Sequence, residues 1–183
     1  MALASVALGM TKEDLATRWL EKGGTADQLR LARYRPRPCS GPQLLYGEHT
    51  DYDGFTFLWR SRTNGLEALL GADWVQVPVL EQDPGALLIN LGDLMEVWSG
   101  GVWHSPRHRV RRVAPEPEQE QKELLSIVWF VGPHPDTRLV PLPSPLVARL
   151  QEGEQVITAG EHVLAKIAKT ASKPEDVIIS AMA

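Results

Sequence analysis

The chain has 183 residues, of which 43% are hydrophobic and 23% charged, and this composition predicts one ordinary globular domain with its own core. The formal net charge of -4 argues against a sequence-independent nucleic-acid binder, because such proteins are normally basic. No apolar run is long enough to span a membrane, and the apolar stretch Met1–Met10 lacks the basic residues of a signal peptide. Cys39 is the single cysteine, which excludes an internal disulfide and fits a reducing compartment. We therefore expect a cytoplasmic protein with neither nucleic-acid nor membrane partners.

The first predicted element is a helix over residues 11–22. Thr11-Lys-Glu-Asp14 has the pattern of a helix start, and Gly23-Gly24 would end the helix. The apolar residues 1–10 before it are interpreted as a buried helix end. Residues 1–27 are therefore expected to form a helical lead-in to the next part of the chain.

The centre of the chain, residues 28–145, has the pattern of a β domain. Runs of strand length are predicted at residues 28–37, 56–59, 74–79, 86–91, 108–113 and 124–131. Glycine and proline pairs such as Pro84-Gly85 and Gly132-Pro133 punctuate the gaps. Several short strands separated by such turns predict a mainly β sandwich or barrel.

The hydrophobic period changes after Pro145. Thr158-Ala-Gly-Glu161 matches the capping box, and the apolar residues that follow recur at helical spacing. Residues 146–183 are therefore expected to form a C-terminal helical segment, so that helices flank the β domain at both ends.

Three residues in the β domain are candidate metal ligands. His49 and Asp51 lie two residues apart, so on an extended segment their side chains point to the same face, and His108 opens a later predicted strand. Two histidines and one carboxylate on one side of an ion leave its other positions open, as in non-haem iron(II) oxygenases. A catalytic zinc with three protein ligands is the alternative.

The remaining histidines and the tryptophans are given structural roles. His104 is not expected to be a ligand, and His134 and His162 are expected to lie on the surface. Asp93, at the end of a predicted strand, is interpreted as a turn or cap residue. The tryptophans expected in the core or the barrel wall are Trp59, Trp74, Trp98, Trp103 and Trp129.

A set of short motifs carries a family resemblance when the motifs are taken together. They are residues 29–36, 49–52, 74–78, 88–93, 108–110, Ser126, 141–143 and 158–162. In this order and spacing they resemble the isopenicillin-N-synthase-like branch of the iron(II)/2-oxoglutarate-dependent dioxygenases. The resemblance implies a double-stranded β-helix, or jelly roll, over residues 28–145. It further implies that His49, Asp51 and His108 bind Fe(2+), that 2-oxoglutarate and O2 are cosubstrates, and that Tyr34 and Ser126 contact the 2-oxoglutarate carboxylate.

The chain departs from the family pattern around that carboxylate. The family's arginine, two residues before the serine, is Leu124 here, and its asparagine, two before the tyrosine, is Ala32. Leucine cannot make the charge-assisted, bidentate pair that a guanidinium makes with a carboxylate. The nearby cations offer no simple replacement: Lys122 shares the strand face of Leu124 only if the strand extends that far, and Arg109 and Arg111 should point out of the barrel. The motifs thus predict an intact iron site beside an incomplete carboxylate site.

Three functions follow as hypotheses. The resemblance implies a 2-oxoglutarate-dependent dioxygenase that hydroxylates or desaturates a small organic substrate. The lost arginine favours an iron-dependent oxidase that does not use 2-oxoglutarate. The N-terminal region that usually packs against the family's barrel is not recognised in this sequence, which favours a truncated barrel that binds metal or ligand without turnover.

Overall fold

The computed structural model describes residues 1–36, 41–80, 82–112, 123–148, 153 and 155–171. Within these residues the chain forms strands β1 (Gln28–Tyr34), β2 (Gln43–His49), β3 (Phe55–Arg60), β4 (Leu66–Leu70), β5 (Asp73–Gln76), β6 (Leu88–Leu91), β7 (His108–Arg112) and β8 (Leu124–Val131). The helices are α1 (Ala2–Ala7), α2 (Asp14–Trp19), α3 (Asp93–Trp98) and α4 (Ala159–Ala171). None of the described helices is both long and apolar enough to cross a membrane.

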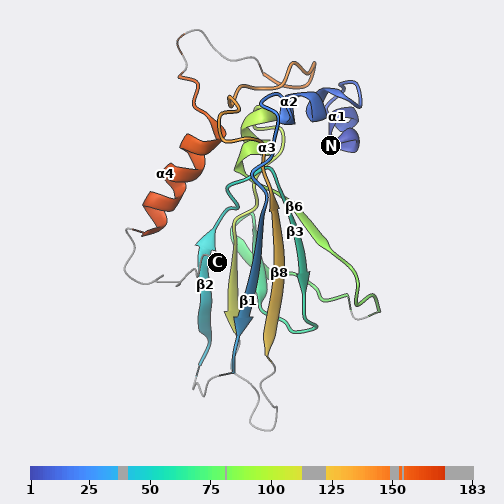
Figure 1. Cartoon of the computed structure of the whole chain (residues 1–183). Helices are drawn as coiled ribbons and strands as arrows, with labels where there is room; N and C mark the ends of the chain where they lie inside the picture. Colours follow the sequence, from blue (N-terminus) through green and yellow to red (C-terminus); the bar gives the residue numbers. More distant parts are fainter. Residues whose placement is uncertain (37–40, 81, 113–122, 149–152, 154, 172–183) are drawn as a thin grey trace.

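The strands form two antiparallel sheets. One sheet has the order β1-β8-β3-β6 and the other the order β2-β7-β4-β5. Both sheets contribute side chains to one cavity, so they face each other as in a jelly roll. Figure 1 shows α1, α2 and α3 gathered at one end of the sheets and α4 beside β2. The prediction of a mainly β jelly roll with helices from both ends of the chain is confirmed.

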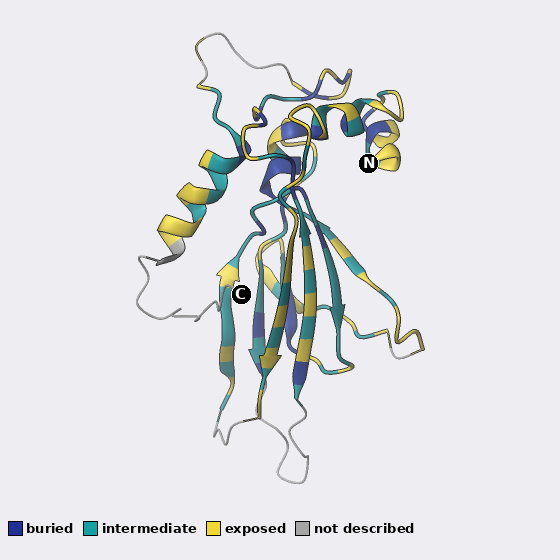
Figure 2. Ribbon diagram, viewed as in Figure 1, coloured by how far each residue is buried: buried dark blue, intermediate teal, exposed yellow. Residues whose placement is uncertain are grey.

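Strand β8 shows how the sequence selects the two faces of its sheet. Leu124, Ser126 and the alternate residues after them line the cavity, whereas Ile127 and Trp129 lie on the outer face. This alternation is the two-residue period of a strand, visible in Figure 2 as exposed bands along the strands. Trp129, which was expected in the core or the barrel wall, therefore lies on the outside of that wall, and 46% of it is exposed.

A tightly packed core joins the helices to one end of the sheets. Trp19 meets Trp98 edge-on with their ring centroids 5.4 Å apart, and both rings are almost fully buried. A side chain at Gly54 would overlap the ring of Trp19, so glycine permits this close approach. The core therefore fixes the loop between β2 and β3, which begins beside the candidate metal ligands.

Several elements differ from the sequence-based predictions. The helix predicted over residues 11–22 spans only Asp14–Trp19. Residues 12–13 form a turn before it, and the Thr11 backbone N–H donates to the Asp14 side chain across this turn. Strands β2 and β4 and the six-residue helix α3 were not predicted. Strand β2 contains Gly47 and its pairing with β7 has register shifts, and both features weaken the alternating pattern that the prediction relied on.

Candidate metal centre

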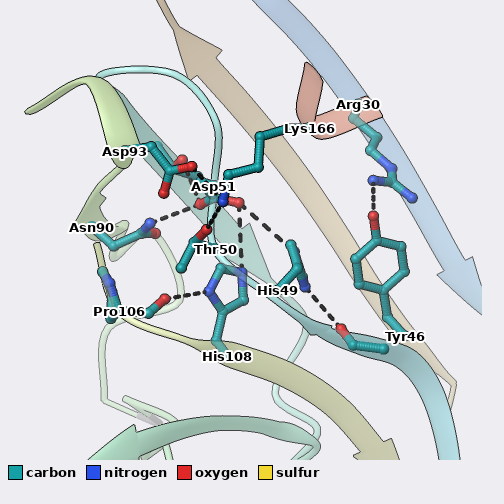
Figure 3. Close-up of polar contacts among 12 residues, drawn as sticks. Arg30, Tyr46, His49, Thr50, Asp51, Asn90, Asp93, Pro106, His108 and Lys166 are labelled. Atoms are coloured by element: carbon teal, nitrogen blue, oxygen red, sulfur yellow. Dashed lines mark hydrogen bonds and ion pairs between the residues drawn. The ribbon is translucent and has the colours of Figure 1, made fainter. Parts of the chain in front are cut away.

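The three predicted ligands meet at one end of the β2–β7 strand pair. His49 ends β2, His108 begins β7 opposite it, and Asp51 lies in the loop after β2. Asp51 Oδ1 is 3.8 Å from His49 Nε2 and 3.6 Å from His108 Nε2. One ligand atom from each of the three residues lies within 4.8 Å of the others. The backbone thus brings together all three residues that the sequence singled out (Figure 3).

Both imidazole rings are oriented by backbone carbonyls. His49 Nδ1 is 2.8 Å from the Gly47 carbonyl oxygen, and His108 Nδ1 is 3.0 Å from that of Pro106. A carbonyl only accepts hydrogen bonds, so each Nδ1 carries the proton and each Nε2 presents a lone pair. Burial, and then repulsion from His108, lowers the pKa of His49 to about 4, so this ring is neutral near pH 7.

The Asp51 carboxylate is held through one of its two oxygens. Its Oδ2 accepts hydrogen bonds from Thr56 Oγ1 at 2.6 Å and from Asn90 Nδ2 at 2.7 Å. These donors come from β3 and β6, and they leave Oδ1 facing the two histidines. Two imidazole nitrogens and one carboxylate oxygen form a donor set that suits iron(II). The side chains of His49, Asp51 and His108 therefore fit the iron(II) ion that the motifs implied.

The loop that carries Asp51 is docked onto the start of α3. The Asp93 backbone N–H donates to the Asp51 carbonyl at 2.9 Å, and the Gly92 N–H donates to the Gly54 carbonyl at 2.8 Å. A Cβ atom at Gly92 would overlap the Asp53 carbonyl oxygen, so this close approach requires glycine. The Gly92-Asp93 pair of the family-like motif therefore positions the loop that carries the candidate ligand Asp51.

The Asp93 side chain links this loop region to α4. Its Oδ2 lies 3.0 Å from His162 Nε2 and 2.8 Å from Lys166 Nζ, and Lys166 Nζ also donates to Thr50 Oγ1 at 3.0 Å. Burial alone would raise the pKa of Asp93, but hydrogen bonds from His162, Lys166 and Thr50 lower it to about 2. The prediction that His162 lies on the surface is wrong, because its ring is packed against Asp93.

The other histidines lie outside the centre. His104 is 78% exposed and contacts Glu96, and His134 is partly exposed near Asp136. Neither belongs to the cluster of ligand atoms around Asp51 in the described part of the chain. His104 therefore serves as a control residue for the metal site.

Tyr34 and Ser126 line the same cavity as the candidate metal ligands. The cavity has a volume of about 280 Å³ and lies between the two sheets. Leu124, which stands at the position of the family's arginine, is 3% exposed and packs with Leu66 and Val110. It is a wall residue of the cavity and offers no polar group.

Two arginines that the sequence analysis did not single out also line this cavity. Arg30 donates to the Tyr46 hydroxyl at 3.1 Å and lies over the Tyr46 ring. Arg60 Nη2 donates to the Val77 and Pro78 carbonyls at 2.8 and 2.5 Å. The alternation of Thr56, Leu58 and Arg60 toward one face of β3 was the signal that could have placed Arg60 inside.

Among the described residues, the arginines considered from the sequence do not line the cavity. Arg109 and Arg111 both approach Glu67, and Arg109 also covers the Trp74 ring, which confirms that they point away from the interior. Lys122 and Cys39 lie outside the described residues.

Comparisons with known proteins agree on one family. A family model described as the 2OG-Fe(II) oxygenase superfamily matches residues 26–133. Validamycin A dioxygenase of Streptomyces hygroscopicus subsp. limoneus is 40% identical over 126 residues, covering 68% of this chain and 33% of that protein. A 1-aminocyclopropane-1-carboxylate oxidase of Prunus mume is 30% identical over 152 residues, covering 81% of this chain and 44% of that protein.

The structural comparison gives the same result for the fold. The crystal structure of a full-length Neurospora crassa protein in complex with alpha-KG has a TM-score of 0.71 and 25% identity. The match covers 91% of this chain and 50% of that one. The chain thus spans half the length of this solved relative, and a third to less than half of the two curated ones.

Proposed function

Because the chain belongs to the 2OG-Fe(II) oxygenase superfamily, we propose that it is a non-haem iron(II), 2-oxoglutarate-dependent dioxygenase. The observation that carries the proposal is the convergence of His49, Asp51 and His108 within 4.8 Å in a cavity between the sheets. The reaction is the hydroxylation or desaturation of a small organic substrate. The cytoplasmic location stays a prediction.

The residues of this chain would hold and orient the metal. His49 and His108 offer Nε2 because their Nδ1 atoms are bound to carbonyls, and Asp51 offers Oδ1 because Thr56 and Asn90 occupy Oδ2. When bound, iron(II) with 2-oxoglutarate would supply the activation of dioxygen that the oxidation needs. His49, Asp51 and His108 all line the cavity, so cosubstrates would reach the metal from the cavity.

The test begins with the metal alone. Purified protein should bind one cobalt(II), a spectroscopic surrogate for iron(II), per chain. His49→Ala, Asp51→Ala and His108→Ala should each weaken binding strongly, because three ligands leave no spare, whereas His104→Ala should have little effect. Equal losses for His104→Ala and His108→Ala would refute the assignment, and tight zinc binding without iron binding would favour a zinc site.

A second candidate function has one observation in its favour. Leu124 replaces the arginine of the 2-oxoglutarate site, so an iron-dependent oxidase that does not use this cosubstrate remains the alternative. Succinate formed from 2-oxoglutarate during oxygen uptake would identify the dioxygenase. Oxygen uptake that is independent of 2-oxoglutarate would identify the oxidase, and no uptake by the iron-loaded protein would favour a barrel that binds without turnover.

A further inference from the structure

The cavity has to provide a partner for a carboxylate if it binds 2-oxoglutarate, which has a carboxylate at each end. A carboxylate that leaves water for a mostly apolar cavity requires a cationic or hydrogen-bonding partner. Tyr34 and Ser126 are neutral, and Leu124 is a buried wall residue. Among the described residues that line the cavity, the cations are Arg30 and Arg60.

Arg30 is already engaged near the metal ligands. Its Nη1 donates to the Tyr46 hydroxyl, and its guanidinium lies 4.8 Å from the centre of the Tyr46 ring. That ring in turn packs edge-on against His49, with the two centroids 4.5 Å apart (Figure 3). Arg30 therefore belongs to the packing around the metal end of the cavity.

Arg60 lies beside the residues that the family resemblance assigns to the carboxylate. In the antiparallel pairing of β3 with β8, Arg60 is directly opposite Ser126, and Ser126 is opposite Ala32 on β1. The neighbouring cavity-lining pair on β1 and β8 is Tyr34 and Leu124. Arg60 is thus one strand away from Ser126 at the same level of the sheet, on the same inward face.

The guanidinium of Arg60 is held at one nitrogen and unsatisfied at another. Nη2 donates to the carbonyls of Val77 and Pro78, which fixes the side chain against the opposite sheet. Nη1 is buried and has no hydrogen-bond partner among the described residues. Burial lowers the pKa of Arg60 from its ordinary value, as expected for a charge with reduced solvation. An incoming anion would satisfy the free donor and stabilise the buried charge.

We propose that Arg60 on β3 replaces the missing arginine of β8 and binds the distal carboxylate of 2-oxoglutarate together with Ser126 and Tyr34. This inference rests on the proposed function, and it adds that the cationic side of the carboxylate site has moved to the neighbouring strand. Leu124 then fills the space that the family's arginine side chain would occupy.

The test measures binding of two 2-oxo acids to the anaerobic iron(II)-loaded protein through the metal-to-ligand charge-transfer band. 2-Oxoglutarate has the distal carboxylate, whereas 2-oxobutyrate has the same metal-binding end without it. Arg60→Met should raise the Kd for 2-oxoglutarate about a hundredfold and leave that for 2-oxobutyrate nearly unchanged. Arg60→Lys should lose about tenfold, since an ammonium keeps the charge but not the planar fork.

Two controls separate the possible outcomes. Arg33→Met removes an arginine that pairs with Glu123 on the outer face of the sheet and should change neither Kd. Cobalt(II) binding shows that each variant is folded, and if Arg60→Met fails to bind it, Arg60→Lys decides the question. If the wild-type protein does not bind cobalt(II), the proposed function itself is refuted. Two results would overturn the assignment of Arg60 and leave the proposed function intact, provided that metal binding is normal. One is an unchanged 2-oxoglutarate affinity in the folded Arg60 variants. The other is a selective loss of 2-oxoglutarate affinity in Arg30→Met instead.

Discussion

At the scale of single residues, the geometry of the candidate metal centre depends on side chains other than the three candidate ligands. Thr56 and Asn90 both donate to Asp51 Oδ2 and thereby decide which carboxylate oxygen faces the histidines. Groups that orient metal ligands in this way typically contribute about 10- to 100-fold to metal affinity. We expect Asn90→Ala to weaken cobalt(II) binding about tenfold, and Thr56→Val to do the same at nearly constant volume, as measured by competition with a chelating dye.

A matched control for Thr56 is available elsewhere in the chain. Thr63→Val removes a hydroxyl that donates to the Glu123 carbonyl at 3.1 Å, away from the metal ligands, and should leave the affinity unchanged. If Thr63→Val and Thr56→Val reduced the cobalt(II) affinity equally, the cause would be general destabilisation. The orienting role assigned to Thr56 would then be wrong.

Leu124 allows a second prediction at the residue scale. It is 3% exposed, and its Cδ1 lies so close to Gly65 that a Cβ atom there would be only 2.8 Å away. An arginine at this position would be oversized and would carry a charge into packed apolar surroundings. We expect Leu124→Arg to reduce the free energy of unfolding by about 3 kcal/mol and Leu124→Met by less than about 1.5, measured by urea denaturation. Tighter 2-oxoglutarate binding by a stable Leu124→Arg variant would show that the original arginine position is still usable.

The sequence predicted which residues cluster as candidate ligands better than it predicted their surroundings. His49 and Asp51 were found because a two-residue spacing on an extended segment fixes a shared face, and His108 because it begins an alternating strand. Asn90 reaches Asp51 from a different strand, and nothing in its local sequence states which residue it will face. His162 was placed on the surface for the same reason, since its partner Asp93 is 69 residues away in the chain.

At the scale of elements, α4 contacts both Asp93 of α3 and the loop after β2 that carries Asp51. The Asp93 carboxylate contacts the side chains of His162 and Lys166 on α4. Lys166 also donates a hydrogen bond to Thr50, the residue between His49 and Asp51. The pKa of Asp93 is about 2, below its ordinary value, so the ionised form is stabilised by folding. This contribution is fully present above about pH 4, the unfolded value, and is lost as the pH falls through 2.

The same contacts predict the effect of removing the carboxylate. Asp93→Asn should lower the free energy of unfolding by about 2 kcal/mol at pH 7, and Lys166→Met by about 1 or less, because Lys166 is one-third exposed and solvent screens its charge. Asp136→Asn, at a carboxylate that is 78% exposed, should have little effect and provides the control. Denaturant titrations at pH 7 and pH 3 measure the free energies of unfolding of these variants and their dependence on pH. An Asp93→Asn variant as stable as wild type at pH 7 would exclude this role.

The elements themselves show where pattern-based prediction ends. The long apolar run of β8 and the alternating β1 were predicted because their period survives intact. Strand β2 was missed because glycine and register shifts interrupt its alternation, and α3 because a six-residue helix is too short to establish a helical period. Both missed elements depend on neighbours that are distant in the sequence. Strand β2 pairs with β7, and α3 contacts the loop after β2 and packs Trp98 against Trp19.

At the scale of the whole molecule, the outer face of the β1-β8-β3-β6 sheet is unusually apolar. The cross-strand register places Leu29 beside Trp129 and Phe57 in one row, and Leu31 beside Ile127 in the next. These rows lie on the exposed side of the strands, and the exposed apolar residues of this face are Leu29, Leu31, Ile89, Leu125, Ile127 and Trp129. A contiguous apolar surface of this kind is uncommon on monomeric proteins.

This face predicts how the isolated chain of 183 residues behaves in solution. Water in contact with neighbouring apolar side chains favours their burial, so we expect the chain to self-associate with rising concentration or to bind a hydrophobic dye. The double substitution Leu31→Thr with Ile127→Thr removes two adjacent side chains while keeping residues that favour strands, and it should reduce both signals without changing cobalt(II) affinity. Leu70→Thr, at a 62%-exposed leucine on β4 in the other sheet, should change neither signal. Light scattering and dye fluorescence measure the two effects, and a dye-silent monomer at high concentration would show that this face needs no cover.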